Sequence, residues 1–145
     1  MGYDRNIAMD AVRFWCYLSP DGRDEIRAWY ERQTEEVQGA VLDALDRLAA
    51  RHPVWWRRKP FGVLHSGACA GLGEIRIEYP KGTHYRILGY FAATGLDFVM
   101  VYPFPKDTDP AYLRACPVAR FRRMEIEHDP RRSGLWHGQP TGWCH

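Results

Sequence analysis

The 145-residue sequence lacks a long apolar run, a low-complexity tract and an internal repeat. It also lacks any pair of cysteines at CxxC spacing, because Cys16, Cys69, Cys116 and Cys144 stand far apart. These absences argue against a membrane span, a secretory leader, a zinc knuckle and a disulfide framework. We therefore predict free thiols, no metal, no small-molecule cofactor, no membrane partner and a cytoplasmic protein.

Charge is modest overall but unevenly distributed along the chain. The formal net charge is +2, with 46% hydrophobic and 26% charged residues, which is ordinary for a globular protein. The first 50 residues hold six arginines against ten acidic residues, whereas residues 51–145 hold fourteen basic against eight acidic residues. The basic half is typical of a polyanion-binding surface and equally compatible with plain solubility. We predict one domain over 1–128 and an irregular tail over 129–145.

The central pattern is a pair of alternating segments joined by a turn. Residues 72–79 alternate apolar and polar side chains, 80–83 carry turn residues, and a second alternation begins at His84. This pattern predicts a β-hairpin. If the loop holds an odd number of residues, the apolar sets share one face and Arg76 lies directly opposite Arg86.

The opposed arginines allow two interpretations. Like charges directly opposite on a sheet are unfavourable, so an anion between them would explain their placement. Alternatively, they are ordinary polar side chains on the solvent face of an antiparallel sheet. A third strand over 98–102 places Tyr102 toward the Arg86 face if its loop is also odd-numbered. We expect the prolines that follow this strand to end the ladder, with Lys106 just beyond.

The N-terminal third of the chain predicts a strand and two helices. Residues 12–18 alternate and are expected to join the sheet as an edge strand. From Arg23 the apolar spacing becomes helical, and Thr34 is the expected N-cap of a second helix. A bend in one long helix is the alternative. Both apolar stripes should cover the same sheet face, with Trp29 and Tyr30 in the core.

The C-terminal part predicts one short helix. Asp109 and Pro110 form a helix start, and Pro117 interrupts that helix early. Residues 118–126 then resume as a short helix or strand. Together, the segments predict an α+β fold with an antiparallel-dominated twisted sheet of about four strands. Two N-terminal helices pack on one face of this sheet, and a short C-terminal helix completes the fold.

Two groups of basic side chains are candidate RNA contacts. The first group follows Trp55 and Trp56 and comprises Arg57, Arg58 and Lys59, a combination typical of single-stranded nucleic-acid surfaces. An aromatic clasp between the helix end and the sheet is the alternative for the tryptophans. The remaining candidates lie in the hairpin and in the C-terminal part, and they are Lys81, His84, Arg120, Arg122 and Arg123.

Three short motifs occur in order after a strand and two helices. They are GLGEIR at 71–76, YRIL at 85–88 and FPK at 104–106. In this order they resemble the RelE/ParE superfamily, and within it the phage-type, HigB-like toxins of type II toxin–antitoxin systems. The resemblance covers about residues 12–119. It implies a RelE-like domain that enters the ribosomal A site, cleaves translated mRNA and is silenced by a cognate antitoxin.

The resemblance also implies a chemistry. The RNA 2′-hydroxyl attacks the adjacent phosphorus without a metal, so the chain would be an endoribonuclease. Arg76 and Arg86 fit the cations that stabilise the phosphorane, since a guanidinium grips a phosphate through two hydrogen bonds. Lys106 fits a further phosphate contact, and Tyr102 is a candidate general base.

The sequence departs from the family at the end of the third strand. Relatives commonly read HGFxKK there, whereas this chain reads YPFPKD at 102–107. The missing histidine leaves Tyr102, His84 and His128 as alternative bases. It favours a second hypothesis, a RelE-fold binding protein without nuclease activity that contacts the ribosome, DNA gyrase or another host protein. The opposed arginines and the retained Lys106 favour the nuclease.

Overall fold

The computed structural model describes residues 12–79, 83–107 and 110–137. Lys81 and the loosely ordered start predicted for 1–11 lie outside these ranges. The strands of the described chain are β1 (Arg13–Tyr17), β2 (Phe61–Val63), β3 (Gly73–Tyr79), β4 (Thr83–Phe91), β5 (Asp97–Pro105) and β6 (Ser133–Leu135). The helices are α2 (Glu25–Glu31), α3 (Glu35–Ala49) and α4 (Pro110–His128), with 3-10 turns η1 (Pro53–Trp55), η2 (Gly67–Cys69) and η3 (Pro130–Arg132).

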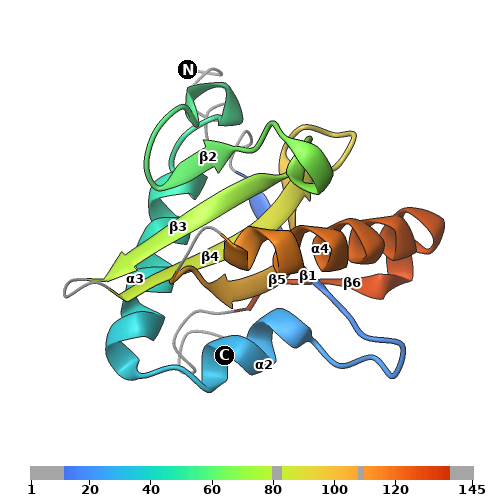
Figure 1. Ribbon diagram of the computed structural model, residues 1–145, viewed down its shortest axis with the longest axis horizontal. Helices are drawn as coiled ribbons and strands as arrows, with labels where there is room; N and C mark the ends of the chain where they lie inside the picture. The colour runs from blue at the N-terminus through green and yellow to red at the C-terminus, as the bar shows by residue number, and fades with distance from the viewer. Residues whose placement is uncertain (1–11, 80–82, 108–109, 138–145) are drawn as a thin grey trace, which may run out of the picture.

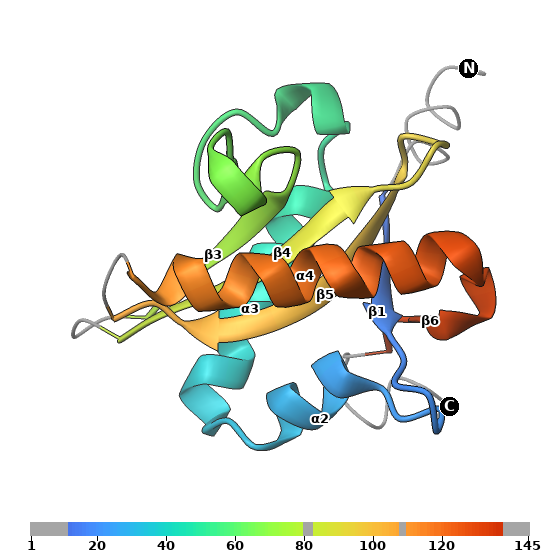
Figure 2. The ribbon, with the colours of Figure 1, turned by 45° about the vertical axis from the view of Figure 1, so that its right-hand side comes forward.

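The six strands form one mixed sheet with the order β2-β3-β4-β5-β1-β6. Only β1 and β5 pair in parallel, and every other neighbouring pair is antiparallel. Helix α4 crosses one face of the sheet, while α3 lies behind the strands (Figure 1; Figure 2). Two separate apolar clusters fill these layers, one shared by α2 and α3 with the sheet and the other by α4 with the sheet.

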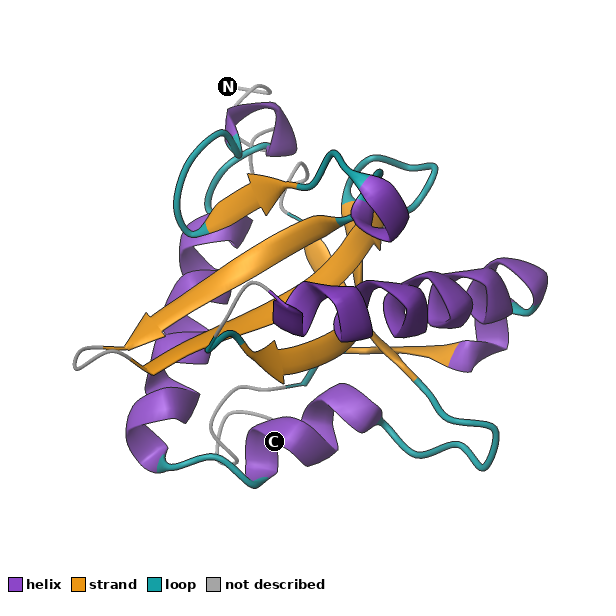
Figure 3. Cartoon of the chain, in the orientation of Figure 1, coloured by secondary structure: helices purple, strands orange, loops and turns teal. Residues whose placement is uncertain are grey.

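This architecture corrects the predicted fold. The α+β class holds, but a sheet of about four strands is wrong, because β2 and β6 add short edges (Figure 3). Each of these strands has three residues, which is too short for an alternating pattern to stand out. The helices α2 and α3 share one face of the sheet, and α4 covers the other. The strand β1 is not an edge, since it lies between β5 and β6.

The two N-terminal helices form as predicted. Asp24 caps α2 by accepting a hydrogen bond from the backbone of Arg27, and Thr34 caps α3 by accepting one from Val37. Each of these residues begins its own helix, and α2 ends at its C-cap Arg32 before Thr34 starts α3. The alternative of one bent helix is therefore wrong. Trp29 of α2 is buried, as expected for a core residue.

Strand β5 continues through the two prolines that were expected to end it. Pro103 pairs with Ile87 and Pro105 pairs with Tyr85. The partner on the other side, β1, reaches only as far as Met100. The far end of β5 therefore has one open edge, where the missing proline amides cost no ladder hydrogen bond.

Helix α4 is continuous and longer than predicted. Pro117 lies inside it on the exposed side, one turn after Leu113, which is 78% exposed. The Leu113 carbonyl that loses its helical partner is thus close to solvent, which makes the proline tolerable. The buried side of α4 consists mostly of small residues, namely Ala111, Ala115, Cys116 and Ala119 together with Ile126.

Two cysteines are joined, contrary to the prediction of free thiols. Cys69 of η2 and Cys116 of α4 form a disulfide across a sequence separation of 47 residues. Cys16 is free and buried. Because the sulfurs come from distant segments, spacing along the chain carries no sign of the bond. The disulfide holds the η2 loop, which precedes β3, against the middle of α4.

The segment after α4 is ordered as far as the structure describes it. The irregular tail predicted from 129 onward contains η3 and β6, and Gly134 of β6 pairs with Cys16 of β1. Trp136 is buried against Tyr30, with ring centroids 5.2 Å apart. None of the helices within 12–79, 83–107 and 110–137 is long and apolar enough to cross a bilayer.

Candidate functional site

Arg76 of β3 and Arg86 of β4 are paired directly across the hairpin, as the sequence predicts. The same register pairs Ile77 with Tyr85, and these side chains pack on the cluster formed with α2 and α3. Since neighbouring residues of a strand point to opposite faces, the arginines project toward the face covered by α4. Arg86 is buried, at 6% exposure, so this position is not an open solvent face.

One buried carboxylate lies between the two guanidinium groups. Glu74, two residues before Arg76 on β3, is 3% exposed. Its Oε2 is 2.9 Å from Nε of Arg76, and its Oε1 is 3.5 Å from Nε of Arg86. From α4, the Tyr112 hydroxyl donates a hydrogen bond of 2.5 Å to Oε1. The anion expected between the arginines is therefore supplied by the chain itself.

The short strand β2 makes room for this arrangement. Gly62 of β2 pairs with Glu74, and Nη2 of Arg76 occupies the space that a β-carbon at position 62 would need. A larger residue there would push the guanidinium away from Glu74. The edge strand that the sequence pattern does not reveal thus helps to position one of the two arginines.

Glu78 and Lys59 extend the network along the hairpin. Oε2 of Glu78 is 3.5 Å from Nη2 of Arg86, and Oε1 is 2.9 Å from Nζ of Lys59. The hydrogen bond from Lys59 is the main reason why the pKa of Glu78 is lowered. Two arginines and one lysine thus meet two carboxylates, which leaves one excess positive charge in the network.

Tyr112 closes the network from the α4 side. Burial, and next the hydrogen bond to the Glu74 carboxylate, raise the pKa of Tyr112 to about 12. The hydroxyl therefore keeps its proton and acts as a donor over the whole physiological range. Nε of Arg86 and Nδ1 of His84 are buried without a hydrogen-bond partner in the described chain, so the contact of Arg86 Nε with Glu74 is electrostatic.

A β-bulge turns Tyr102 toward the same side of the sheet. Leu88 pairs with Tyr102, but the next residue, Gly89, pairs with Met100, so Val101 is the extra residue of β5. Met100 packs on the α2 and α3 side, whereas Tyr102 packs on the α4 side. Tyr102 thus lies on the predicted face, although a bulge rather than simple alternation places it there.

The other candidate catalytic residues are Tyr102, which lies on β5, and Lys106, which follows directly after β5. Tyr102 stacks on Phe104, with ring centroids 6.1 Å apart, and Arg122 of α4 lies over its ring. No hydrogen bond or ion pair in the described chain joins Tyr102 to either arginine of the hairpin. The backbone amide of Lys106 donates to the carbonyl of His84 at 2.9 Å, which places Lys106 next to the start of β4.

The three arginines that were predicted to contact RNA in the C-terminal part instead link α4 to the rest of the protein. Arg120 donates to the carbonyl of Ala70 at 3.0 Å, and Arg122 donates to the carbonyl of Val101 at 2.9 Å. Arg123 pairs with Glu127 at 3.1 Å and lies over the ring of Tyr90. Each side chain is engaged by an intramolecular contact.

The two adjacent tryptophans have different environments. Trp56 is 5% exposed and stacks on Phe14, so the aromatic-clasp interpretation holds for this residue. Trp55 is 65% exposed. Arg57, which follows them, donates from Nε to the carbonyl of Val54 at 3.1 Å. The predicted contact group therefore keeps one exposed indole beside its cations.

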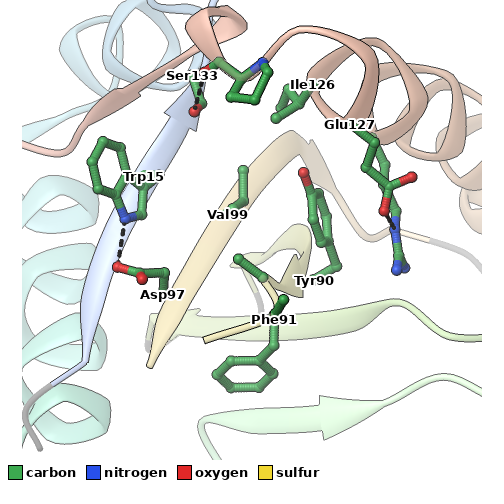
Figure 4. A pocket seen from close by; sticks show the side chains of 12 residues that line it. Trp15, Tyr90, Phe91, Asp97, Val99, Ile126, Glu127 and Ser133 are labelled. Atoms are coloured by element: carbon green, nitrogen blue, oxygen red, sulfur yellow. Dashed lines mark hydrogen bonds and ion pairs between the residues drawn. The ribbon is translucent and has the colours of Figure 1, made fainter. Parts of the chain in front are cut away.

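An apolar hollow of about 620 Å³ lies near the C-terminal half of α4, away from the Glu74 network (Figure 4). Trp15, Tyr90 and Ile126 contribute to its walls. The Asp97 carboxylate at its margin accepts a 2.8 Å hydrogen bond from Nε1 of Trp15. Arg13 and Thr94 bind the same carboxylate, so this polar group is already satisfied and does not orient a ligand.

Sequence reasoning does not single out Glu74 and Tyr112, although the sequence holds a signal for Glu74. Glu74 shares the polar face of β3 with Arg76, so a carboxylate two residues away is a natural partner for the guanidinium. Nothing along the chain connects Tyr112 with β3, because α4 docks through tertiary packing. No three metal-ligating side chains gather within the part of the chain that the structure describes.

Comparison with protein-family models, with curated proteins and with solved structures found no match to this chain.

Proposed function

We propose that this chain is a toxin of a type II toxin–antitoxin system, and that it stops translation by binding at the ribosome rather than by cutting mRNA. The likeness of residues 71–76, 85–88 and 104–106 to the RelE/ParE superfamily supports a toxin. The observation that favours ribosome binding over mRNA cleavage is the position of the Glu74 carboxylate between Arg76 and Arg86.

A substrate phosphate would have to replace this carboxylate. Glu74 is buried, and Tyr112 and both arginines hold it in place. An incoming phosphodiester would gain the attraction of the arginines only by breaking attractions of similar strength. Leaving the displaced carboxylate buried and unpaired would cost several kcal/mol more. The cations needed to stabilise a phosphorane are thus already neutralised in this arrangement.

Endoribonuclease activity by 2′-hydroxyl attack is the second candidate, and one observation favours it. The cross-strand register of Arg76 and Arg86 is the arrangement that phosphate binding requires, and Tyr102 lies on the same side of the sheet. The network also retains one excess positive charge. An RNA that binds tightly enough to displace Glu74 from the two arginines would convert the network into a phosphate-binding site.

The proposed function implies which partners the protein has and in which compartment it acts. A ribosome inhibitor of this kind acts in the cytoplasm on ribosomes that carry mRNA, and its cognate antitoxin keeps it silent until it is needed. It requires no cofactor and no membrane. Because the cytoplasm keeps thiols reduced, we expect Cys69 and Cys116 to be thiols during this action and a disulfide after oxidation.

Inducible expression in bacteria, with mapping of mRNA 5′ ends, tests the proposal. We expect growth arrest and loss of protein synthesis with no new mRNA ends. New ends inside translated codons, lost in Arg76→Ala and Arg86→Ala, would establish the nuclease instead. Growth and protein synthesis that continue at normal rates would overturn the toxin assignment.

A further inference from the structure

The exposed ring of Trp55 is unusual in a chain that buries most of its large apolar side chains. Trp55 is 65% exposed, whereas the neighbouring Trp56 is 5% exposed. Nε1 of Trp56 donates to the carbonyls of Leu48 and Arg51 at 3.0 and 3.2 Å, which fixes the turn after α3. Trp55 is therefore held at the surface by a rigid neighbour rather than by packing of its own.

A small hollow lies beside Trp55 and is lined by cations. Its volume is about 60 Å³. The residues that line it come from the end of α3 and the segment before β2, and they are Arg47, Leu48, Arg51, Trp55, Trp56, Arg58, Lys59 and Pro60. No carboxylate belongs to this lining. The hollow is thus positive and has an indole at its edge.

Two of these cations are available to a ligand. Arg47 pairs with Asp43 at 3.1 Å, and Lys59 pairs with Glu78 at 2.9 Å. The side chains of Arg51 and Arg58 make no hydrogen bond or ion pair with any other residue that the structure describes. In contrast to Arg76 and Arg86, their guanidinium groups are not neutralised by the chain.

The size of the hollow restricts the ligand. About 60 Å³ corresponds to roughly two water molecules. A small-molecule site usually has several hundred Å³, so the hollow fits a single anionic group such as a phosphate and not a whole metabolite. The exposed indole offers a face on which a base can stack next to that phosphate. Base stacking beside phosphate-binding cations is the arrangement by which proteins hold single-stranded nucleic acid.

We propose that Arg51 and Arg58 hold one phosphate of single-stranded RNA and that the neighbouring base stacks on Trp55. This inference rests on the proposed function only for the choice of RNA as the natural strand. The site is separate from the Glu74 network, although Lys59 lines the hollow and also pairs with Glu78 of that network. It gives a ribosome-binding protein a direct contact with an unpaired segment of RNA.

Binding of a fluorescently labelled single-stranded RNA oligonucleotide to the full chain, measured by anisotropy, tests the site. We expect Trp55→Ala to weaken binding about tenfold, because the variant loses the ring on which a base stacks. Arg58→Ala should weaken it several-fold and reduce the slope of log affinity against log salt by about 1. RNA duplex of the same length should bind more weakly than the single strand.

Two variants on α4 serve as matched controls. Phe121→Ala removes an aromatic side chain that is 56% exposed, and Arg114→Ala removes an exposed cation. Both should bind the single strand within about twofold of the unaltered chain, because neither residue lines the hollow. Thermal unfolding of each variant checks that the exposed substitutions leave the fold intact.

Several outcomes would overturn the site. Unchanged affinity of Trp55→Ala and Arg58→Ala for RNA would do so, as would losses in the α4 controls of the same size. Vesicles of anionic lipid bound more tightly than RNA, with the same dependence on Trp55, would assign the surface to a membrane instead.

The same variants separate this inference from the proposed function. RNA binding that depends on Trp55, in a chain that does not arrest growth, would support the RNA site and contradict the toxin function. Growth arrest by a chain that binds no RNA would contradict the RNA site and support the toxin function. Arrest that is relieved by Trp55→Ala would support both.

Discussion

Arg76 and Arg86 face each other across the β3–β4 hairpin and share one carboxylate, that of Glu74. The carboxylate resolves the repulsion that two opposed arginines would otherwise suffer in a sheet. It also explains how Arg86 is tolerated at 6% exposure, because buried charges persist where they are paired. The three side chains should therefore behave as one unit in folding.

Glu74→Gln should be strongly destabilising. The substitution keeps an acceptor for Tyr112 but removes the charge that compensates Arg86. We expect a loss of about 3 kcal/mol in the free energy of unfolding, the usual cost of breaking a buried ion pair. Urea denaturation at neutral pH measures it. Glu78→Gln is the matched control and should cost much less, since that side chain is 29% exposed. Equal losses in the two variants would contradict the central role of Glu74.

Alkaline titration should report the contact between Tyr112 and Glu74. The folded protein raises the pKa of Tyr112 from 10 to about 12, so the protonated form is the one that folding favours. Its contribution to stability is complete below pH 10 and is lost as the pH rises from 10 to about 12. Thermal unfolding between pH 9 and 12 should thus show a smaller decline in Tyr112→Phe than in the unaltered chain.

A second tyrosine allows the cause to be isolated. Tyr90 also has a pKa of about 12, but from burial and the charge of Glu127 rather than from Glu74. In a tyrosinate absorbance titration, Glu74→Gln should lower the pKa of Tyr112 and leave that of Tyr90 unchanged. An unchanged pKa of Tyr112 would show that its hydroxyl does not depend on this carboxylate, and a shift of both tyrosines would show a general loosening of the fold instead.

The disulfide should stabilise the oxidised protein. Linking Cys69 to Cys116 closes a loop with a sequence separation of 47 residues, and a loop of that length is worth about 4 kcal/mol in the chain-entropy model. Reductant should lower the urea midpoint of the unaltered chain and expose two further thiols in a thiol assay. The double variant Cys69→Ser/Cys116→Ser should be insensitive to reductant. A midpoint unaffected by reductant in the unaltered chain would show that the bond does not form in solution.

The sequence predicts the parts of this fold that depend on local pattern. The β3–β4 register and the Thr34 cap follow from alternation, turn residues and cap chemistry within a few residues of chain. The short strands β2 and β6 do not, because three residues carry no period. The length of α4 is also hidden, since its buried side consists mostly of small residues and Pro117 lies within it.

The candidate site shows the same division. The pairing of Arg76 with Arg86 follows from the hairpin, but their neutralisation depends on how the side chains and α4 pack. Tyr112 reaches Glu74 across 38 residues of chain, and Gly62 meets Arg76 only because β2 joins the sheet. Chemistry that depends on which charges are already paired is therefore decided by tertiary contacts.

Gly62→Ala should act on the network through Arg76 alone. The added β-carbon would take the space of Nη2 of Arg76, which lies at the end of a flexible side chain, so the backbone need not move. We expect the guanidinium to leave Glu74, with a loss of about 1.5 kcal/mol, the lower end of the range for a hydrogen bond to a charged group, because Arg76 is partly exposed. In an Arg76→Ala background, the same glycine substitution should be neutral, because the three atoms nearest to the added β-carbon all belong to the Arg76 guanidinium. Urea denaturation of the four proteins gives the coupling energy directly. Equal effects of Gly62→Ala in both backgrounds would mean that Gly62 serves the strand itself and not the position of Arg76.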